Sequence, residues 1–257
     1  MADKSKPTAK ENYLVKHIGG EENQETRTEL PSLAFGVRSV AISAIGFALV
    51  IIIQLFYEKP LWDYSVGPNG IQTFQDEISD HMKKVWKLES ALGGGKEQMV
   101  LIGVTFFWGR RSKLMYYLIF FALDKSYVNF FKLAYHDPRP YMINSNIVPI
   151  SCSRAFGNPS GHSSSSLMVP IVLFLDIFHG KTYKHHKPEF FATPPYVMSL
   201  FLALFWPSTI PFTRYVLGVH SLDQILFGVT LGLWGGLTCH FVIRDHVINH
   251  IEESLRH

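Results

Sequence analysis

The sequence predicts an all-α integral membrane protein built as a six-transmembrane-helix bundle. Only 18% of the 257 residues are charged and 14% are aromatic, and the mean hydropathy is +0.11. That average is mild because the chain ends are polar, whereas long apolar segments recur through the middle of the chain. We expect these segments to be helices, since a helix satisfies its own backbone hydrogen bonds inside a bilayer.

This distribution divides the chain into two regions. Residues 1–30 form a polar N-terminal tail with almost no apolar periodicity, which predicts a disordered or surface-lying segment. The tail lacks the apolar core and small-residue cleavage site of a secretory signal, so we expect it to be retained. Residues 31–250 are then expected to form a six-helix membrane domain.

The first two expected spans lie in the N-terminal half. A helix needs about 20 mostly apolar residues to cross a bilayer core of about 30 Å. Leu33–Tyr57 exceeds that length with few polar interruptions. Ala91–Gly109 is the weakest of the six spans, because three glycines, Lys96 and Glu97 occupy its first half.

The third expected span, Leu114–Ala134, carries two charges in its middle. Asp124 and Lys125 are costly inside a bilayer, so we expect them to face the interior of the helix bundle. Lys125 lies seven residues before Lys132, which places both lysines on one helix face. Asp124 then offsets part of the positive charge that the two lysines concentrate.

The remaining spans follow in the C-terminal half. Leu167–Phe178 is too short to cross alone, and it becomes a span only if its helix begins near Gly161. Tyr196–Phe212 and Leu222–Ile243 are long and apolar. Six spans are therefore expected in total.

The connecting segments predict an orientation. Short basic loops favour the cytoplasmic side, and residues 110–113 and 181–187 are such loops. If the basic tail is cytoplasmic as well, residues 132–162 and 214–220 lie on the opposite face. We expect a multi-pass protein of the endoplasmic reticulum or another endomembrane with this face in the lumen, the plasma membrane being the alternative.

The first segment on that face is KLAYHDPRP, residues 132–140. Lys132 ends the third span and Arg139 follows seven residues later. Pro138 and Pro140 stop the helix and turn the chain along the surface. Taken singly, each cation would be a side chain that reaches the membrane interface, which is a common structural role.

Two further segments carry the same kind of chemistry. In NPSGH, Ser160 is suited to cap a helix, and Gly161 leaves the first backbone N–H groups open to an anion. In TRYVLGVHSLDQ, Arg214 precedes His220 by six residues at the entrance to the last span.

The six-span topology brings these three segments to one membrane face. There they combine three cations, a serine hydroxyl and free helix-start amides with His162 and His220. Such a set of positive groups repels itself unless it encloses an anion. Guanidinium groups and oriented amides suit phosphate oxygens, so we expect a cradle for a phosphoryl group.

Taken together, the three segments resemble the signature of a known family. Residues 132–140 fit Lys, six residues, Arg-Pro; residues 159–162 are Pro-Ser-Gly-His; residues 214–220 fit Arg, five residues, His. This ordered trio resembles the signature of the type 2 phosphatidic acid phosphatase superfamily, which includes lipid phosphate phosphatases, glucose-6-phosphatase, dolichyl diphosphate phosphatase and vanadium haloperoxidases. The resemblance covers roughly residues 92–243 and implies a membrane bundle with a type 2 phosphatidic acid phosphatase core.

The resemblance also implies roles for individual residues. His220 is the expected nucleophile, which takes the phosphoryl group as phosphohistidine. His162 is expected to protonate the leaving oxygen and then to activate the water that releases phosphate; an ordinary histidine pKa of about 6.5 suits both tasks. The groups expected to bind the phosphoryl oxygens are Lys132, Arg139, Ser160, the Gly161 amide and Arg214.

The third motif departs from the family pattern. The pattern begins Ser-Arg and places an Asp four residues after the nucleophilic histidine, whereas this chain has Thr213 and Gln224, with Asp223 one residue too early. The carboxylate would accept the second N–H of His220 and fix its tautomer. Positions three and four residues later both lie on the helix face of His220. Alignment favours Gln224 as the orienting group, and chemistry favours Asp223.

Cofactors and partners are expected to be few. No Asp/Glu cluster with metal-ligand spacing accompanies the motifs in the sequence, and fixed cations can neutralise a phosphoryl group, so we expect no metal and no other cofactor. The expected partners are a lipid phosphate or another phosphorylated substrate and membrane lipids. A net charge of +3 gives no reason to expect nucleic acid.

The function expected from these observations is that of a metal-independent membrane phosphatase acting on a phosphomonoester or diphosphate, most plausibly a lipid phosphate. A transferase that passes the phosphoryl group or a phospho-headgroup to an alcohol uses the same histidine intermediate and is the first alternative. A noncatalytic membrane scaffold or lipid-binding subunit is the second.

Overall fold

The computed structural model describes residues 37–104, 111–184 and 193–255. The polar tail predicted over residues 1–30 lies outside these ranges. Every regular element in the described part of the chain is helical. The helices are α2 (Val37–Val66), α3 (Ile71–Glu77), α4 (Asp80–Leu92), α5 (Gly95–Val104), α6 (Arg111–Tyr135), α7 (Pro140–Ile143), α8 (Gly161–Lys184), α10 (Pro194–Val216), α11 (Leu222–Thr238) and α12 (Arg244–Ser254), with a π-helical segment at Cys239–Ile243.

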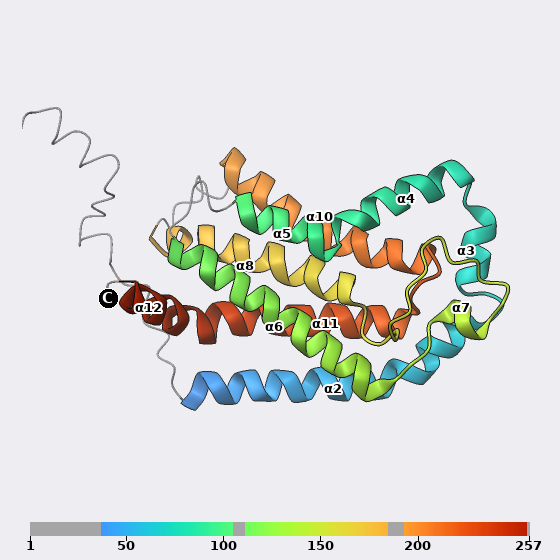
Figure 1. The fold of residues 1–257 in the computed structure, drawn as a ribbon, viewed down its shortest axis with the longest axis horizontal. Coiled ribbons are helices and arrows are strands. Elements are labelled where there is room, and N and C mark those ends of the chain that lie inside the picture. Colours follow the sequence, from blue (N-terminus) through green and yellow to red (C-terminus); the bar gives the residue numbers. More distant parts are fainter. Residues whose placement is uncertain (1–36, 105–110, 185–192, 256–257) are drawn as a thin grey trace, which may run out of the picture. The chain divides into compact units, whose positions relative to one another are not determined.

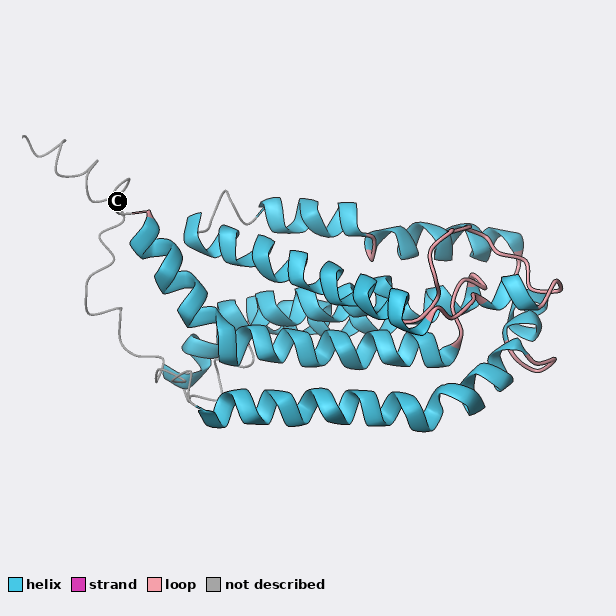
Figure 2. Ribbon diagram, turned by 60° about the horizontal axis from the view of Figure 1, so that its bottom comes forward, coloured by secondary structure: helices cyan, strands magenta, loops and turns pink. Residues whose placement is uncertain are grey.

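The long helices lie side by side (Figure 1). α11 packs against α8 and α2, α8 also packs against α10, and α6 packs against α8. α6 and α10 end, and α8 and α11 begin, at the end of the bundle where the loops gather (Figure 2). The segments that carry the three motifs therefore meet at that end.

Four helical stretches in the described residues are long and apolar enough to cross a bilayer: residues 38–66, 161–179, 194–216 and 222–254. They contain the fourth, fifth and sixth expected spans and residues 38–57 of the first. α8 begins at Gly161, as the fourth span required. α6 covers the third expected span with 25 residues, but its charged residues make it less apolar. Four spans are supported in this way, and the count of six remains a prediction.

The second expected span, Ala91–Gly109, is wrong as a continuous helix. α4 ends at Leu92, and N–H groups of Gly93 and Gly94 close a turn before α5 begins. A side chain at Gly93 would overlap Ile210 of α10, so the glycine allows the end of α4 to approach that helix. Residues 105–109 of this expected span lie outside the described residues.

The outward faces of the bundle are apolar. Ile42, Leu55 and Phe56 of α2 are 71%, 65% and 74% exposed, which is the arrangement expected where lipid replaces water as the solvent. An apolar cavity of about 510 Å³ lies between α2 and α11 and is lined by residues such as Ile42, Val50 and Trp234. Its lining includes none of the motif residues. The described residues therefore form an integral membrane bundle.

Glycines bring α8 and α11 into close contact. A side chain at Gly228 would overlap the carbonyl of Ser160, and one at Gly232 would overlap the backbone of Ser164. Small residues four apart on one face allow two helix backbones to approach closely in a membrane. This packing holds the start of α8 against the start of α11, where two of the three motifs lie.

Candidate active site

His220 lies in the short connection between α10 and α11 and is almost fully buried, with 2% of its surface exposed. Its Nδ1 is 3.1 Å from Oε1 of Gln224, in the first turn of α11. Nε2 of Gln224 donates to the carbonyl of Pro138 at 2.8 Å, which turns the amide oxygen toward the imidazole. An amide oxygen only accepts, so Nδ1 of His220 carries the hydrogen.

Arg139 contacts the other nitrogen of the same ring. Its Nη1 lies 3.1 Å from Nε2 of His220 and donates to the carbonyl of Val219 at 3.0 Å. Its Nε donates to the carbonyl of Ala155 at 2.8 Å. A guanidinium group only donates, so Nε2 of His220 is the acceptor and keeps its lone pair. Arg139 and Gln224 thus select the same tautomer independently.

The surroundings of His220 also keep the ring neutral. Burial lowers the pKa of His220 well below its usual value, and the charges of Arg139, Arg214 and Lys132 lower this pKa further. A neutral imidazole with a lone pair on Nε2 is the form of histidine that can act as a nucleophile.

Arg214, at the end of α10, is held by a residue that the sequence did not suggest. Its Nη1 donates to Oγ of Ser90 on α4 at 2.6 Å, and both side chains are buried, with 7% and 2% exposed. Nε of Arg214 has no hydrogen-bond partner among the described residues. An unpaired guanidinium N–H is a donor available to a phosphoryl oxygen.

Lys132 is anchored by the backbone of the loop that precedes α8. Its Nζ donates to the carbonyl of Phe156 at 2.7 Å, one residue after the carbonyl that Arg139 contacts. Within the described residues, none of the three cations Lys132, Arg139 and Arg214 forms an ion pair with a carboxylate. Cations that are buried without a carboxylate partner are costly unless an anion joins them.

The start of α8 completes this arrangement. Ser160 is fully buried and occupies the position before the first helical residue, where its Oγ accepts from Oγ of Ser163 at 2.8 Å. The N–H of Ser160 donates to the carbonyl of Gln224 at 2.9 Å, so the start of α8 is fixed to the start of α11. The first N–H groups of α8, beginning with that of Gly161, have no intrahelical acceptor and suit an anion.

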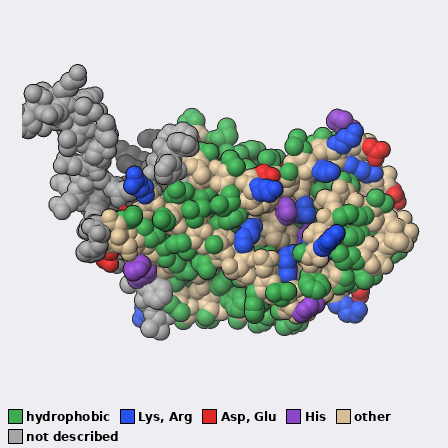
Figure 3. All heavy atoms as spheres, in the orientation of Figure 1, with side chains coloured by type: hydrophobic (Ala, Val, Ile, Leu, Met, Phe, Trp, Pro, Cys, Tyr) green, Lys and Arg blue, Asp and Glu red, His purple; other side chains and the backbone are tan. Residues whose placement is uncertain are grey.

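His162 is the second residue of α8 and is partly exposed. On the face of the molecule shown in Figure 3, Lys and Arg side chains and a histidine gather around a recess. The charges of Arg214, Arg139 and Lys132 all act on His162 as well as on His220. The two predicted catalytic histidines thus share one basic environment.

Asp223 does not reach His220 in the structure. Its side chain is buried, with 1% exposed, and its Oδ1 has no partner among the described residues. The contact with Nδ1 of His220 is made by Gln224. Of the two alternatives that the sequence left open, the geometry brings together His220 and Gln224.

Three polar residues before the motifs support the site from α2, α3 and α4. Ser65 accepts the N–H of Leu222 at 3.0 Å at the start of α11. Gln75 donates to the carbonyls of Val148 at 2.9 Å and Val216 at 3.3 Å. Ser90 is the third. No sequence motif marks them, because their partners lie more than 70 residues away.

No group of three or more His, Cys, Asp or Glu residues in the described part of the chain is arranged to hold a metal ion.

Comparisons with known proteins agree with this geometry. No curated protein matches the chain. A crystal structure of a transmembrane PAP2-type phosphatidylglycerolphosphate phosphatase from Bacillus subtilis has a similar fold, with a TM-score of 0.58, 19% identity, and coverage of 83% of this chain and 96% of that chain. The model of the PAP2 superfamily matches residues 113–247, more than half of the chain, and this range contains all three motifs. The chain therefore belongs to the PAP2 superfamily and is a hydrolase of the phosphatase type.

Proposed function

We propose that this protein is a metal-independent membrane phosphatase that hydrolyses a lipid phosphate, a phosphomonoester or diphosphate, through a phosphohistidine intermediate. The observation that carries the proposal is that a neutral, oriented His220 contacts Arg139 and lies in the field of further cations that no described carboxylate neutralises. Phosphoryl transfer needs alignment and charge neutralisation more than covalent help from the protein. These are the two features that such a site supplies.

In the first step, Nε2 of His220 attacks phosphorus and the bond from phosphorus to the leaving oxygen breaks. His162 donates a proton to that oxygen, so an alcohol leaves from a phosphomonoester and a monophosphate leaves from a diphosphate. The lone pair of Nε2 must first be released by Arg139, whose Nη1 lies 3.1 Å away. If Arg139 donates instead to a phosphoryl oxygen of the substrate, it exchanges one acceptor for another. The lone pair of Nε2 is then exposed.

In the second step, water attacks the phosphohistidine and the N–P bond breaks. His162, now neutral, takes the proton from the water, and inorganic phosphate leaves. Lys132, Arg139, Arg214, Ser160 and the Gly161 amide would stabilise the charge on the phosphoryl oxygens in both steps. The Nδ1 hydrogen bond to Gln224 would stabilise the positive imidazole that forms.

A lipid phosphate is the proposed substrate class because the site lies at the end of a helix bundle with apolar outward faces. The test is an assay of the purified protein against lipid phosphates, polyprenyl diphosphates and sugar phosphates, with and without an acceptor alcohol. We expect inorganic phosphate from a lipid substrate, inhibition by orthovanadate and no effect of EDTA. Loss of activity in EDTA that a metal restores would overturn the metal-independent mechanism, and a phosphorylated alcohol as the main product would indicate a transferase.

We also propose that the site faces away from the cytoplasm, as the basic segments 110–113 and 181–187 suggest. Cys152 lies in the loop between α7 and α8 and is exposed, whereas Cys239 is buried. A membrane-impermeant maleimide should therefore label Cys152 from the lumenal or outer side of sealed vesicles. Labelling from the cytoplasmic side alone would reverse the orientation.

A further inference from the structure

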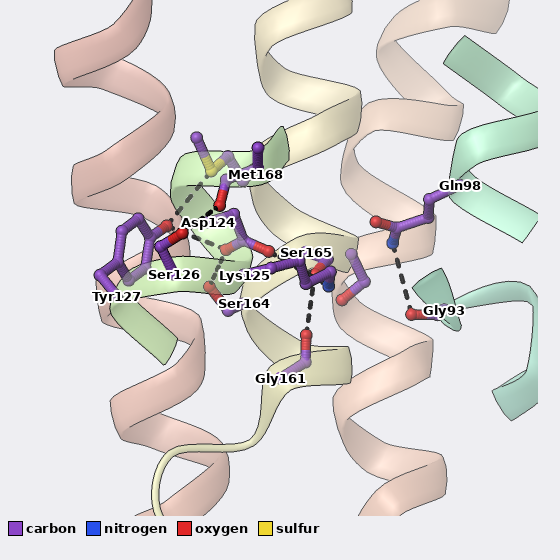
Figure 4. Close-up of polar contacts among 12 residues, drawn as sticks. Gly93, Gln98, Asp124, Lys125, Ser126, Tyr127, Gly161, Ser164, Ser165 and Met168 are labelled. Carbon is purple, nitrogen blue, oxygen red and sulfur yellow. Dashed lines mark hydrogen bonds and ion pairs between the residues drawn. The ribbon is translucent and has the colours of Figure 1, made fainter. Parts of the chain in front are cut away.

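A buried polar cluster lies beside the second turn of α8, just past the start of that helix (Figure 4). Its centre is the carboxylate of Asp124, which is 0% exposed. Asp124 accepts hydrogen bonds from Ser164 at 2.6 Å, Ser165 at 2.6 Å and Tyr127 at 2.9 Å. The mechanism proposed above uses none of these side chains. Ionisable groups at membrane depth are costly, so a cluster of them indicates a functional site.

Lys125 extends from α6 at the edge of this cluster. Its Nζ lies 3.2 Å from Oδ2 of Asp124 and also donates to Oγ of Ser165. The ammonium group lies 4.8 Å from the centre of the Phe121 ring. An ammonium group has three donors, and these two polar contacts leave one of them for a ligand. The side chain is 33% exposed, so a ligand can approach it.

Gln98 lies on α5, which packs against α6, the helix that carries Lys125. Its Nε2 donates to the carbonyl of Gly93 at 3.4 Å, and it is buried, with 2% exposed. Its Oε1 has no hydrogen-bond partner among the described residues, which is costly for a buried acceptor. In Figure 4 the carboxamide of Gln98 is directed from α5 toward the side on which Lys125 and Ser165 lie.

Packing between α5 and α6 supports this proximity. A Cβ added to Gly95 would lie 3.7 Å from Cε of Lys125, so the lysine stem passes close to the start of α5. Gln98 is three residues after Gly95 and shares its helix face. The two side chains therefore offer a charged donor and an unpaired acceptor in one region of the bundle.

We propose that Lys125 and Gln98 form a subsite for a hydroxyl group that the substrate carries close to its phosphate. A hydroxyl both accepts and donates, so it satisfies the ammonium of Lys125 and Oε1 of Gln98 together. A carbonyl or an ether oxygen satisfies only Lys125. This inference rests on the proposed phosphatase function and narrows its substrate class.

The depth of the subsite matches such a substrate. Ser165, which Lys125 contacts, lies one helical turn beyond Gly161, with its Oγ 2.9 Å from the carbonyl oxygen of that residue. Four residues of helix span about 6 Å. In a glycerol phosphate, four bonds join phosphorus to the neighbouring hydroxyl oxygen, about 5 Å at roughly 1.2 Å per bond. With phosphorus at the start of α8, that hydroxyl reaches the level of Lys125.

The same hydroxyl occurs in two kinds of phosphate ester. A monoacylglycerol phosphate carries it in a lipid, and glycerol phosphate or a sugar phosphate carries it in water. The ring of Phe121 beside Lys125 and the apolar outward faces of the bundle favour the lipid. A polyprenyl phosphate has no hydroxyl at this position and serves as a lipid that bypasses the subsite.

The test compares 1-oleoylglycerol 3-phosphate with its 2-deoxy analogue in mixed micelles, using the purified full-length protein. We expect kcat/KM to be about 10-fold higher for the hydroxyl substrate, a usual effect of a hydrogen bond to a charged group. Gln98→Leu and Lys125→Met should each bring this ratio close to one, whereas Lys125→Arg should keep part of it. Gln54→Leu, which replaces another buried glutamine on α2, is the matched control and should keep the wild-type ratio.

The outcomes separate the subsite from the phosphatase function. Equal kcat/KM for the two lipids in the wild type, with polyprenyl phosphate also hydrolysed, overturns the subsite and leaves the function intact. Hydrolysis of none of the phosphates overturns both. A preference for the hydroxyl seen only with glycerol phosphate against propanediol phosphate overturns the lipid as its source. If Lys125→Met does not fold because Asp124 loses its cation, an unchanged ratio in Gln98→Leu is sufficient to reject the subsite.

Discussion

Nη1 of Arg139 lies 3.1 Å from Nε2 of His220, while Nδ1 of the same ring faces Gln224. The arginine therefore occupies the lone pair with which His220 would attack phosphorus. A bound phosphoryl group would draw Arg139 away by offering a charged acceptor. In the proposed mechanism, the same side chain would cover Nε2 of His220 before the substrate binds and would then contact a phosphoryl oxygen.

The first prediction concerns the protonation of His220. Burial and nearby cations lower its pKa well below the usual value, so His220 should stay neutral at pH values where an ordinary histidine, with a pKa of about 6.5, is half protonated. Histidine NMR signals of a ¹⁵N-labelled sample would show this, with His220→Gln providing the assignment. Bound vanadate should raise this pKa, because its negative charge offsets the cations.

The lowered pKa of His220 also makes the free energy of unfolding depend on pH. Below about pH 6.5 the unfolded chain binds a proton at this position that the folded chain does not bind. His220 should therefore lower the free energy of unfolding as the pH falls from that value toward the pKa of the folded state. A titration of His220 at the ordinary value would contradict the neutral, buried nucleophile.

The second prediction separates the two histidines by leaving group. His220→Ala should reduce turnover of every substrate by roughly 1,000-fold or more, because the nucleophile is gone. His162→Ala should slow formation of the phosphohistidine from an alkyl phosphate by about 100- to 10,000-fold and its formation from p-nitrophenyl phosphate much less, since that leaving group needs no proton. Release of phosphate from the intermediate should slow for both substrates. His81→Ala, at an exposed position on α4, is the control. Equal slowing of phosphohistidine formation from both substrates in His162→Ala would refute its role as the acid.

The third prediction concerns the group that orients His220. Gln224→Leu removes the acceptor 3.1 Å from Nδ1 and should lower kcat by roughly 10- to 100-fold, as loss of an orienting partner often does. KM should change little, because the phosphate ligands remain. Asp223→Asn should have a small effect on kcat, since Asp223 does not contact the imidazole. The opposite ranking of the two variants would make Asp223 the orienting residue.

The fourth prediction concerns Ser90. Ser90→Ala removes the hydrogen bond at 2.6 Å that holds Nη1 of Arg214, and the inhibition constant for orthovanadate should rise about 10-fold. Ser90→Thr retains the hydroxyl and should restore most of the affinity. Ser208→Ala on α10, whose hydroxyl contacts only the carbonyl of Leu204 within the described residues, is the matched control. Unchanged vanadate inhibition in Ser90→Ala would mean that α4 does not position Arg214.

The fifth prediction concerns the contact between α8 and α11. Gly232→Ala places a methyl group against the backbone of Ser164, and the overlap should lower the free energy of unfolding by about 1–3 kcal/mol. Gly103→Ala on α5 is the control, because nothing lies within 4 Å of a methyl group there. Thermal unfolding in detergent measures both variants. Equal transition temperatures for the two would show that close packing of these helices is not required.

Local sequence patterns predicted much of the fold. Apolar length predicted the helices around residues 33–57, 114–134, 196–212 and 222–243, and the short segment at 167–178 required the observed start of α8 at Gly161. The break between α4 and α5 was not predicted as a structural boundary, although the three glycines at 93–95 were the signal for it. The close approach of Gly93 to α10 depends on Ile210, a residue more than 100 positions away, and no local pattern reveals this contact.

The sequence by itself determined which residue types are available to the site. Each of the three motifs is a continuous stretch of the chain, so the spacing of its residues is visible in the sequence. Only the tertiary structure decided between Gln224 and Asp223 as the neighbour of His220, since one helix face admits both and the bond from Gln224 to Pro138 favours one. It alone revealed Ser65, Gln75 and Ser90, whose partners lie on other helices. The physical reason is that hydrogen-bond partners are set by the packing of helices distant in the chain, whereas helix formation follows from apolar length within one segment.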